Sequence, residues 1–163
     1  MKFSDYTRVF RIDEYMLNHC SSILFVLKGC DFIGKSVGKV FEENWKNSVP
    51  DNIWIYRPPD AAQSFNQNSS LRFSRKSPCD YMMFNGEYLF CLELKSVAGK
   101  SISFERTEKD NGTIHYHQIK YLKNCLKYRN LIPGLVIDFR GTGNTWFLHI
   151  RDWDRLVDSI SKK

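Results

Sequence analysis

The segment SPCDYMMFNGEYLFCLELKS, residues 77–96, carries an aspartate, a glutamate and a lysine around a predicted β-hairpin. Its Asn-Gly pair, flanked by apolar runs, is the strongest short-range signal for a two-residue hairpin turn. Because side chains alternate between strand faces, such a turn places Asp80, Glu93 and Lys95 on one face and leaves the other face apolar. Asp80 then falls opposite Cys91 and is a diagonal neighbour of Glu93, roughly 7–8 Å away at the backbone. A turn of three or four residues would change this pairing.

Asp80, Glu93 and Lys95 together are suited to the chemistry of a phosphodiester. Two converging carboxylates repel each other, and burying them unpaired is costly, so a hard divalent cation would stabilise them. Oxygen ligands favour Mg²⁺, Mn²⁺ or Ca²⁺ over zinc, and such an ion activates water and stabilises charge on a phosphate. Lys95 would hold the attacking water or neutralise the developing charge. The other interpretation is an ordinary surface ion pair between Glu93 and Lys95 at a strand end.

The elements that must position these side chains follow from hydrophobic spacing and turn residues. They predict an α/β domain at residues 34–163, with a mixed central sheet flanked by helices. Residues 1–33 form an N-terminal extension of unclear role, and 58–76 form a long polar loop or a small protruding element. The predicted elements are a helix at 36–48, a strand at 53–57, the two hairpin strands, a helix at 113–130, strands at 132–140 and 145–150, and a helix at 151–163.

The charge of the chain suggests an anionic partner. The 163 residues carry a formal net charge of +6, with a pI of about 9.1. Nucleic acid is the commonest partner of such a domain, although many basic domains simply have basic surfaces. The apolar runs are too short to predict a transmembrane segment, so no membrane partner is expected.

The cysteines predict neither a disulfide framework nor a zinc site. There are five of them, and none forms a C-x-x-C spacing. Cys79, Cys91 and Cys125 lie in apolar or strand-like contexts and are expected to be small buried residues. A reducing cytosol fits this usage.

Further motifs support one family. Asp80, followed thirteen residues later by Glu93-Leu94-Lys95, resembles the PD-(D/E)xK nuclease signature, with one residue inserted after Pro78. Five blocks also occur in the order seen in RecU-like Holliday junction resolvases, particularly the short phage or prophage versions. The resemblance covers about residues 34–150 and implies a restriction-endonuclease-like core. The blocks are GKVFEENW at 38–45, YRPPDAAQSF at 56–65, SPCDYMMF at 77–84, LELKS at 92–96 and HQIKYL at 117–122.

The resemblance implies a metal-dependent, structure-selective endonuclease of a bacterial or phage-infected cytoplasm. Such enzymes cut four-way DNA junctions as homodimers with Mg²⁺ or Mn²⁺, leaving a 5′-phosphate and a 3′-hydroxyl. The family pattern places the metal on Asp80, Glu93 and the backbone carbonyl of Leu94, and makes Lys95 the catalytic lysine. Glu42 matches an acidic residue that binds metal directly or through water, with the adjacent Glu43 as the alternative.

Other residues are assigned roles by the same resemblance. Gln118 matches a glutamine that orients water, lysine or phosphate. Taken without the family, Glu42 would be a solvent-facing helix residue and Gln118 a capping or surface residue. His115 and His117 are expected at the helix start, where a phosphate contact is the alternative to a plain polar role. Segment 58–76 corresponds to the family's stalk, shorter here than in the longest members. The basic residues expected to contact DNA phosphates are Arg57, Arg72, Arg75, Lys76 and Lys100.

Two other functions stay open at this point. One is a different DNA endonuclease of restriction or repair type that shares the same core. The other is a non-catalytic DNA-binding module, against which the intact Asp80, Glu93 and Lys95 argue.

Overall fold

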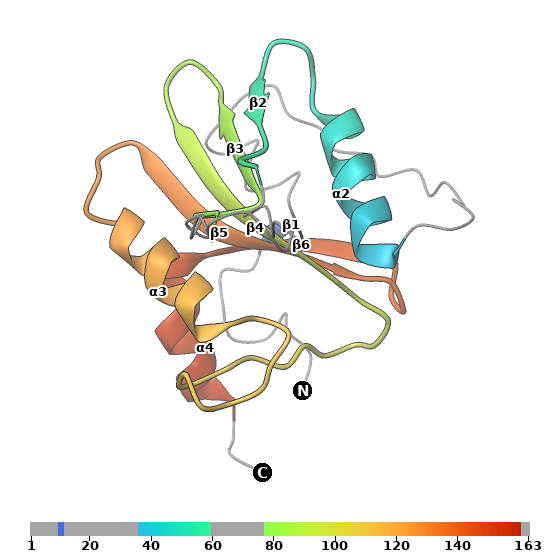
Figure 1. Ribbon diagram of the computed structural model, residues 1–163, viewed down its shortest axis with the longest axis vertical. Coiled ribbons are helices and arrows are strands. Elements are labelled where there is room, and N and C mark those ends of the chain that lie inside the picture. The colour runs from blue at the N-terminus through green and yellow to red at the C-terminus, as the bar shows by residue number, and fades with distance from the viewer. Residues whose placement is uncertain (1–9, 12–35, 60–76, 161–163) are drawn as a thin grey trace, which may run out of the picture.

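The computed structural model describes residues 10–11, 36–59 and 77–160, which form a mixed six-stranded sheet with helices on both faces (Figure 1). The strand order is β1-β6-β5-β4-β3-β2, and only β4 and β5 pair in parallel. The strands are β1 (Phe10–Arg11), β2 (Trp54–Tyr56), β3 (Tyr81–Phe84), β4 (Leu89–Val97), β5 (Leu131–Phe139) and β6 (Asn144–His149). The helices are α2 (Val37–Ser48), α3 (Tyr116–Cys125) and α4 (Trp153–Ser159), the last preceded by the short 3₁₀ helix η2 (Ile150–Asp152).

This architecture confirms the predicted α/β class and the order of elements from α2 to α4. The parallel pairing of β4 with β5 requires a crossover, which α3 supplies. Strand β1, which pairs with β6, lies in the N-terminal extension and was not predicted. The rest of residues 1–33 and residues 60–76 lie outside the described residues. No helix of the described part is long and apolar enough to cross a membrane.

Each face of the sheet carries its own buried core. Helix α2 contributes Phe41 and Trp45 to one core, and α3 and α4 lie together over the opposite face (Figure 1). The strand residues of the α2 face include Tyr81, Met83, Phe90, Leu92, Leu94, Val136 and Phe147. The core of the α3 face includes Cys79, Cys91, Ile119, Leu122, Cys125, Leu135, Ile137, Leu148 and Trp153.

The turn of the β3–β4 hairpin has four residues, so the predicted two-residue turn was wrong. The ladder runs from Phe84 opposite Leu89 to Tyr81 opposite Leu92. The side-chain oxygen of Asn85 accepts the backbone N–H groups of Glu87 and Tyr88 at 2.9 and 2.6 Å, and Gly86 takes the left-handed conformation with φ 97°. This use of Asn and Gly is typical of turns that bend the chain sharply.

The longer turn shifts the pairing by two residues, which leaves each paired strand side chain on its predicted face. Asp80 therefore stays on the same face as Glu93 and Lys95. Continuing the observed register by one step brings Asp80 beside Glu93, instead of opposite Cys91. The two carboxylates are consequently closer than the sequence predicted.

The helix predicted at residues 113–130 is shorter than expected. An extended segment precedes it, because Phe104 bridges Ile114 and the N–H groups of Thr113 and Ile114 both donate to the carbonyl of Ser103. Helix α3 therefore begins at Tyr116 and ends at Cys125. This extended pairing brings the connection after β4 against the start of α3.

Candidate active site

Asp80 and Glu93 lie together at one end of the β3–β4 hairpin. The backbone N–H of Asp80 donates to the carbonyl of Leu92 at 3.0 Å, and its Oδ2 accepts the N–H of Leu94 at 2.7 Å. The partners in these two bonds are the residues before and after Glu93, so the bonds hold Asp80 beside Glu93. Glu93 itself is only 4% exposed. The sheet ladder therefore holds both acids without help from a flexible loop.

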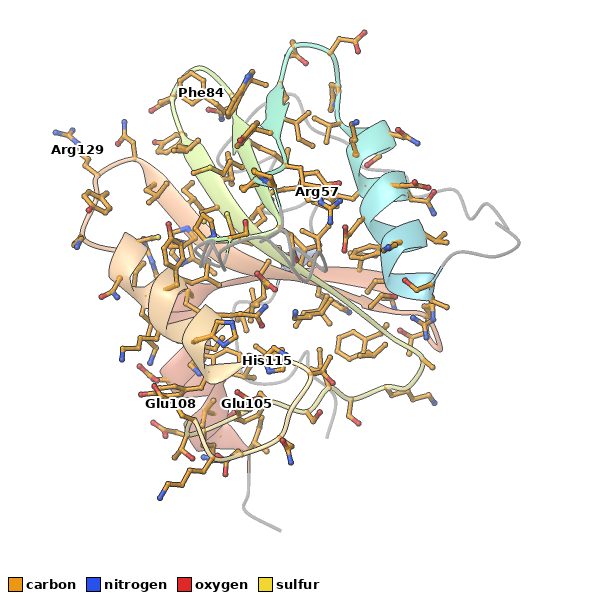
Figure 2. The ribbon with its side chains drawn as sticks, in the orientation of Figure 1. Arg57, Phe84, Glu105, Glu108, His115 and Arg129 are labelled. Carbon is orange, nitrogen blue, oxygen red and sulfur yellow. The ribbon has the colours of Figure 1, made fainter. Side chains whose placement is uncertain are left out.

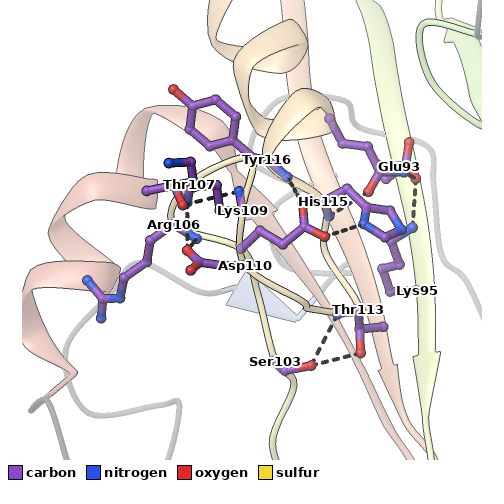
Figure 3. Close-up of polar contacts among 12 residues, drawn as sticks. Glu93, Lys95, Ser103, Arg106, Thr107, Lys109, Asp110, Thr113, His115 and Tyr116 are labelled. Carbon is purple, nitrogen blue, oxygen red and sulfur yellow. Dashed lines mark hydrogen bonds and ion pairs between the residues drawn. The ribbon is translucent and has the colours of Figure 1, made fainter.

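Glu93 has a basic partner on its own strand and an amide partner on α3. The Nζ of Lys95 lies 2.8 Å from Oε1 of Glu93 (Figure 3). The side-chain amide of Gln118 donates to the same oxygen. The other end of this amide, Oε1, accepts the backbone N–H of His115 at 3.0 Å, so Gln118 ties Glu93 to the start of α3. The structure thus brings Asp80, Glu93, Lys95 and Gln118 together.

The electrostatics of the site disfavour the charged form of Glu93. Burial raises the pKa of Glu93 to about 7, and the Asp80 carboxylate, within hydrogen-bonding reach, acts in the same direction. Lys95 favours the charged form of Glu93 but does not outweigh these two effects. A carboxylate with a raised pKa is one whose charge the protein alone does not fully compensate.

The donor set fits a hard divalent cation. Mg²⁺ is typically held by one or two carboxylates, with water and substrate phosphate filling the other positions. Asp80 and Glu93 supply that pair of carboxylates. Within the ranges that the structure describes, no group of three or more His, Cys, Asp or Glu side chains is arranged to hold a metal ion.

Glu42 lies in helix α2, and its basic partner is Arg57, whereas that of Glu93 is Lys95. Its Oε2 is 2.9 Å from the guanidinium of Arg57, which Figure 2 shows beside α2. The carbonyl of Glu42 accepts the hydroxyl of Tyr81 at 3.4 Å. Burial raises the pKa of Tyr81, Arg57 lowers it, and Glu42 and Asp80 raise it, so both acids lie near this hydroxyl. The contacts of Glu93 instead come from Lys95, Gln118 and Asp80.

The residues expected to contact DNA are only partly placed. The Arg57 side chain is 44% exposed while paired with Glu42. Lys100 is exposed in the connection that follows β4. Arg72, Arg75 and Lys76 fall outside the described residues, so the structure does not place them.

The structure adds one residue that sequence reasoning missed, Glu105. Its Oε1 lies 2.7 Å from Nδ1 of His115, and its Oε2 accepts the N–H of Tyr116 at 2.8 Å (Figure 3). The contacts with His115 and Tyr116 lower the pKa of Glu105. His115 and His117 lie at the start of α3 as predicted, with their rings stacked 5.5 Å apart.

The predicted burial of Cys79, Cys91 and Cys125 is confirmed. Cys91 lies within hydrogen-bonding reach of both Cys79 and Cys125 on the α3 face. The contact with Cys79, together with burial, raises the pKa of Cys91. The three cysteines therefore belong to the core of the α3 face.

Fold and site together define an α/β protein with a buried glutamate, an aspartate beside it and a lysine at the end of a hairpin. No family model matches the chain. The chain is 41% identical over 118 residues to the SPbeta prophage-derived uncharacterized protein YotM of Bacillus subtilis (strain 168). The aligned region covers 71% of this chain and 57% of that protein, so the chain spans little more than half the length of this relative.

Proposed function

We propose that the protein is a metal-dependent DNA endonuclease that resolves four-way junctions on a restriction-endonuclease-like core. The observation that carries this proposal is the carboxylate pair, with Asp80 beside the buried Glu93 and Lys95 at 2.8 Å from Glu93. The motif order shared with RecU-like resolvases and the similarity to a prophage-derived protein support it. The net charge of +6 favours a polyanionic substrate.

The chain's own side chains divide the chemistry between them. Asp80 and Glu93, with the carbonyl of Leu94, would hold a Mg²⁺ or Mn²⁺ ion, which when bound would supply Lewis acidity and an activated water. Lys95 positions the attacking water and neutralises charge on the phosphate. Gln118 holds Glu93 in its orientation through a hydrogen bond to Oε1. Attack on the phosphorus and loss of the 3′ oxygen give a 5′-phosphate and a 3′-hydroxyl.

The partner is branched DNA, and the enzyme acts as a homodimer. Symmetric cutting of a four-way junction requires two identical active sites related by a two-fold axis, which a homodimer provides. The place of action is the cytoplasm of a bacterial or phage-infected cell.

The test is cleavage of a labelled four-way junction and of its linear duplex arms by the purified protein, with Mg²⁺, Mn²⁺ or EDTA. We expect metal-dependent cutting of the junction alone. Asp80→Asn should lower the rate by a factor of about 1,000 or more, which corresponds to roughly 4 kcal/mol of lost transition-state stabilisation, while junction binding persists. Asp51→Asn makes the same chemical change at an exposed position and should cut like the wild type.

Two outcomes would favour the alternative functions. Equal rates on junction and linear duplex would indicate a restriction or repair endonuclease that shares the core. Absence of cutting with either metal, together with tight junction binding, would indicate a non-catalytic DNA-binding module.

A further inference from the structure

The Glu105–His115 pair lies next to the candidate site and has no part in the chemistry proposed above. Glu105 uses both carboxylate oxygens, one on the imidazole Nδ1 at 2.7 Å and one on the backbone of Tyr116 at 2.8 Å. The Glu105 side chain is 12% exposed and that of His115 is 48% exposed. A largely buried carboxylate therefore binds Nδ1 of an imidazole whose ring is partly open to solvent.

The hydrogen bond between Glu105 and His115 determines which ring nitrogen of His115 carries the hydrogen. A carboxylate accepts hydrogen bonds, so Glu105 fixes the tautomer in which Nδ1 carries the hydrogen. In the neutral ring, Nε2 then presents a lone pair. An imidazole held in this way is a proton acceptor, and the carboxylate behind it stabilises the imidazolium that forms.

The backbone of His115 is tied to the carboxylate pair through Gln118 at the start of α3. The backbone N–H of His115 donates to Gln118, and Gln118 donates to Glu93. Figure 3 draws the ring of His115 on the Glu93–Lys95 side of the start of α3. The ionisable groups that contact the ring are Glu105 from the preceding connection and His117 from its own helix. Glu93 and Lys95 of β4 lie beyond Gln118, which contacts Glu93.

We propose that His115 is the general base of the reaction and that Glu105 is its positioning residue. Nε2 of His115 takes a proton from the attacking water as the water oxygen bonds to phosphorus. The bond from phosphorus to the 3′ oxygen breaks, and that oxygen takes a proton from solvent. His115 then releases its proton to solvent, so protons and charge balance over the cycle. This inference rests on the proposed endonuclease function and adds the residue that activates the water.

The test compares single-turnover cleavage of the four-way junction by wild type, His115→Asn and His115→Ala, together with junction binding. Asparagine is a good residue before a helix and keeps a polar contact for Glu105, but it does not accept the proton. We expect both variants to cut about 100-fold more slowly at unchanged junction affinity. Added imidazole should restore cutting by His115→Ala, which a purely structural role would not explain.

Variants at two carboxylates sharpen the assignment. Glu105→Gln should slow cutting by about tenfold, since the amide no longer enforces the tautomer. Glu108→Gln removes an exposed carboxylate of the same connection, seen near Glu105 in Figure 2, and should cut at the wild-type rate.

Each other outcome decides against the inference. Wild-type rates for His115→Asn would overturn it and leave the endonuclease function standing. Slow cutting with weakened junction binding and no rescue by imidazole would indicate a phosphate contact and overturn the proton transfer. A wild type that never cuts would overturn the endonuclease function, and with it this role for His115.

Discussion

The two faces of the β3–β4 hairpin differ in what they bury. On the α2 face, Tyr81, Met83 and Leu92 pack against Phe41 and Trp45 in an apolar core. On the α3 face, Cys91 of β4 lies in one core with Cys79 and Cys125. Beyond them lies the Asp80–Glu93 pair, which Lys95 and Gln118 contact. Successive side chains of a strand point to opposite faces of the sheet, so one hairpin can line an apolar core on one face and carry polar residues on the other. Under the proposed function, α2 stabilises the fold while the α3 face carries the chemistry.

The largest effect should come from the α2 face. Trp45 is fully buried, and Trp45→Ala should lower the free energy of unfolding by about 3–5 kcal/mol through lost burial and a cavity. Chemical denaturation followed by circular dichroism measures this loss. Trp54→Ala is the matched control, because the side chain of Trp54 is 54% exposed and its loss should cost about 1 kcal/mol or less.

The contrast between the two faces would fail if Trp45 were also needed for junction cleavage. Where Trp45→Ala remains folded at low temperature, its rate of junction cleavage should stay close to that of the wild type. A large fall in cleavage by a folded variant would show that α2 does more than support the sheet.

An intermediate effect should come from the pH dependence of stability that Glu93 causes in metal-free protein. The folded form binds this proton more tightly, with a pKa of about 7 against 4.5 for the ordinary group. The stabilisation is therefore complete below about pH 4.5 and is lost as the pH rises through about 7. At 1.36 kcal/mol per pKa unit, the contribution of Glu93 falls by roughly 3 kcal/mol between pH 4.5 and pH 8.

Denaturant unfolding in EDTA from pH 5 to pH 8 measures this dependence, with Glu93→Gln as the comparison. Because glutamine does not titrate, the variant should lack the Glu93 contribution, and the difference between the two curves reports that contribution together with the interaction of Glu93 with Asp80. Parallel curves for the two proteins would mean that Lys95 fully compensates the glutamate. Under the proposed function, Mg²⁺ should also restore wild-type stability at pH 8.

The smallest effect should come from Arg57, at the edge of the α2 face. Its ion pair with Glu42 is partly exposed, so Arg57→Ala should lower the free energy of unfolding by less than about 1 kcal/mol. If Arg57 also contacts DNA phosphate, the salt dependence of junction binding should weaken by about one ion. Arg129→Ala, at an exposed position near β5, is the control (Figure 2). A stability loss above 2 kcal/mol would show that the pair is structurally important.

The sequence predicted the shared face of Asp80, Glu93 and Lys95 because a strand repeats every two residues. That periodicity survives the difference between a two-residue and a four-residue turn. The turn length itself was not predictable from Asn-Gly alone, since the side chain of Asn85 organises the longer turn through two backbone contacts. The direct apposition of Asp80 and Glu93 was therefore missed.

Glu105 was missed for a different reason. It lies in a polar connection with no hydrophobic period, and it meets His115 ten residues later only because Phe104 bridges Ile114. The pairing of Glu42 with Arg57 is likewise a contact between separate elements. Contacts of this kind depend on packing in three dimensions, which spacing along one element does not reveal.

The buried thiols of the α3 face allow the local opening of α3 to be measured. Cys79, Cys91 and Cys125 are at most 5% exposed, so an alkylating reagent reaches them only when α3 separates from the sheet. That same separation would withdraw Gln118 from Glu93 and admit water to the carboxylates. In a variant with serine at positions 20 and 30, the rate of alkylation of the three buried cysteines would report how often α3 opens away from the sheet. Bound DNA or metal would slow alkylation if it stabilised the closed position of α3.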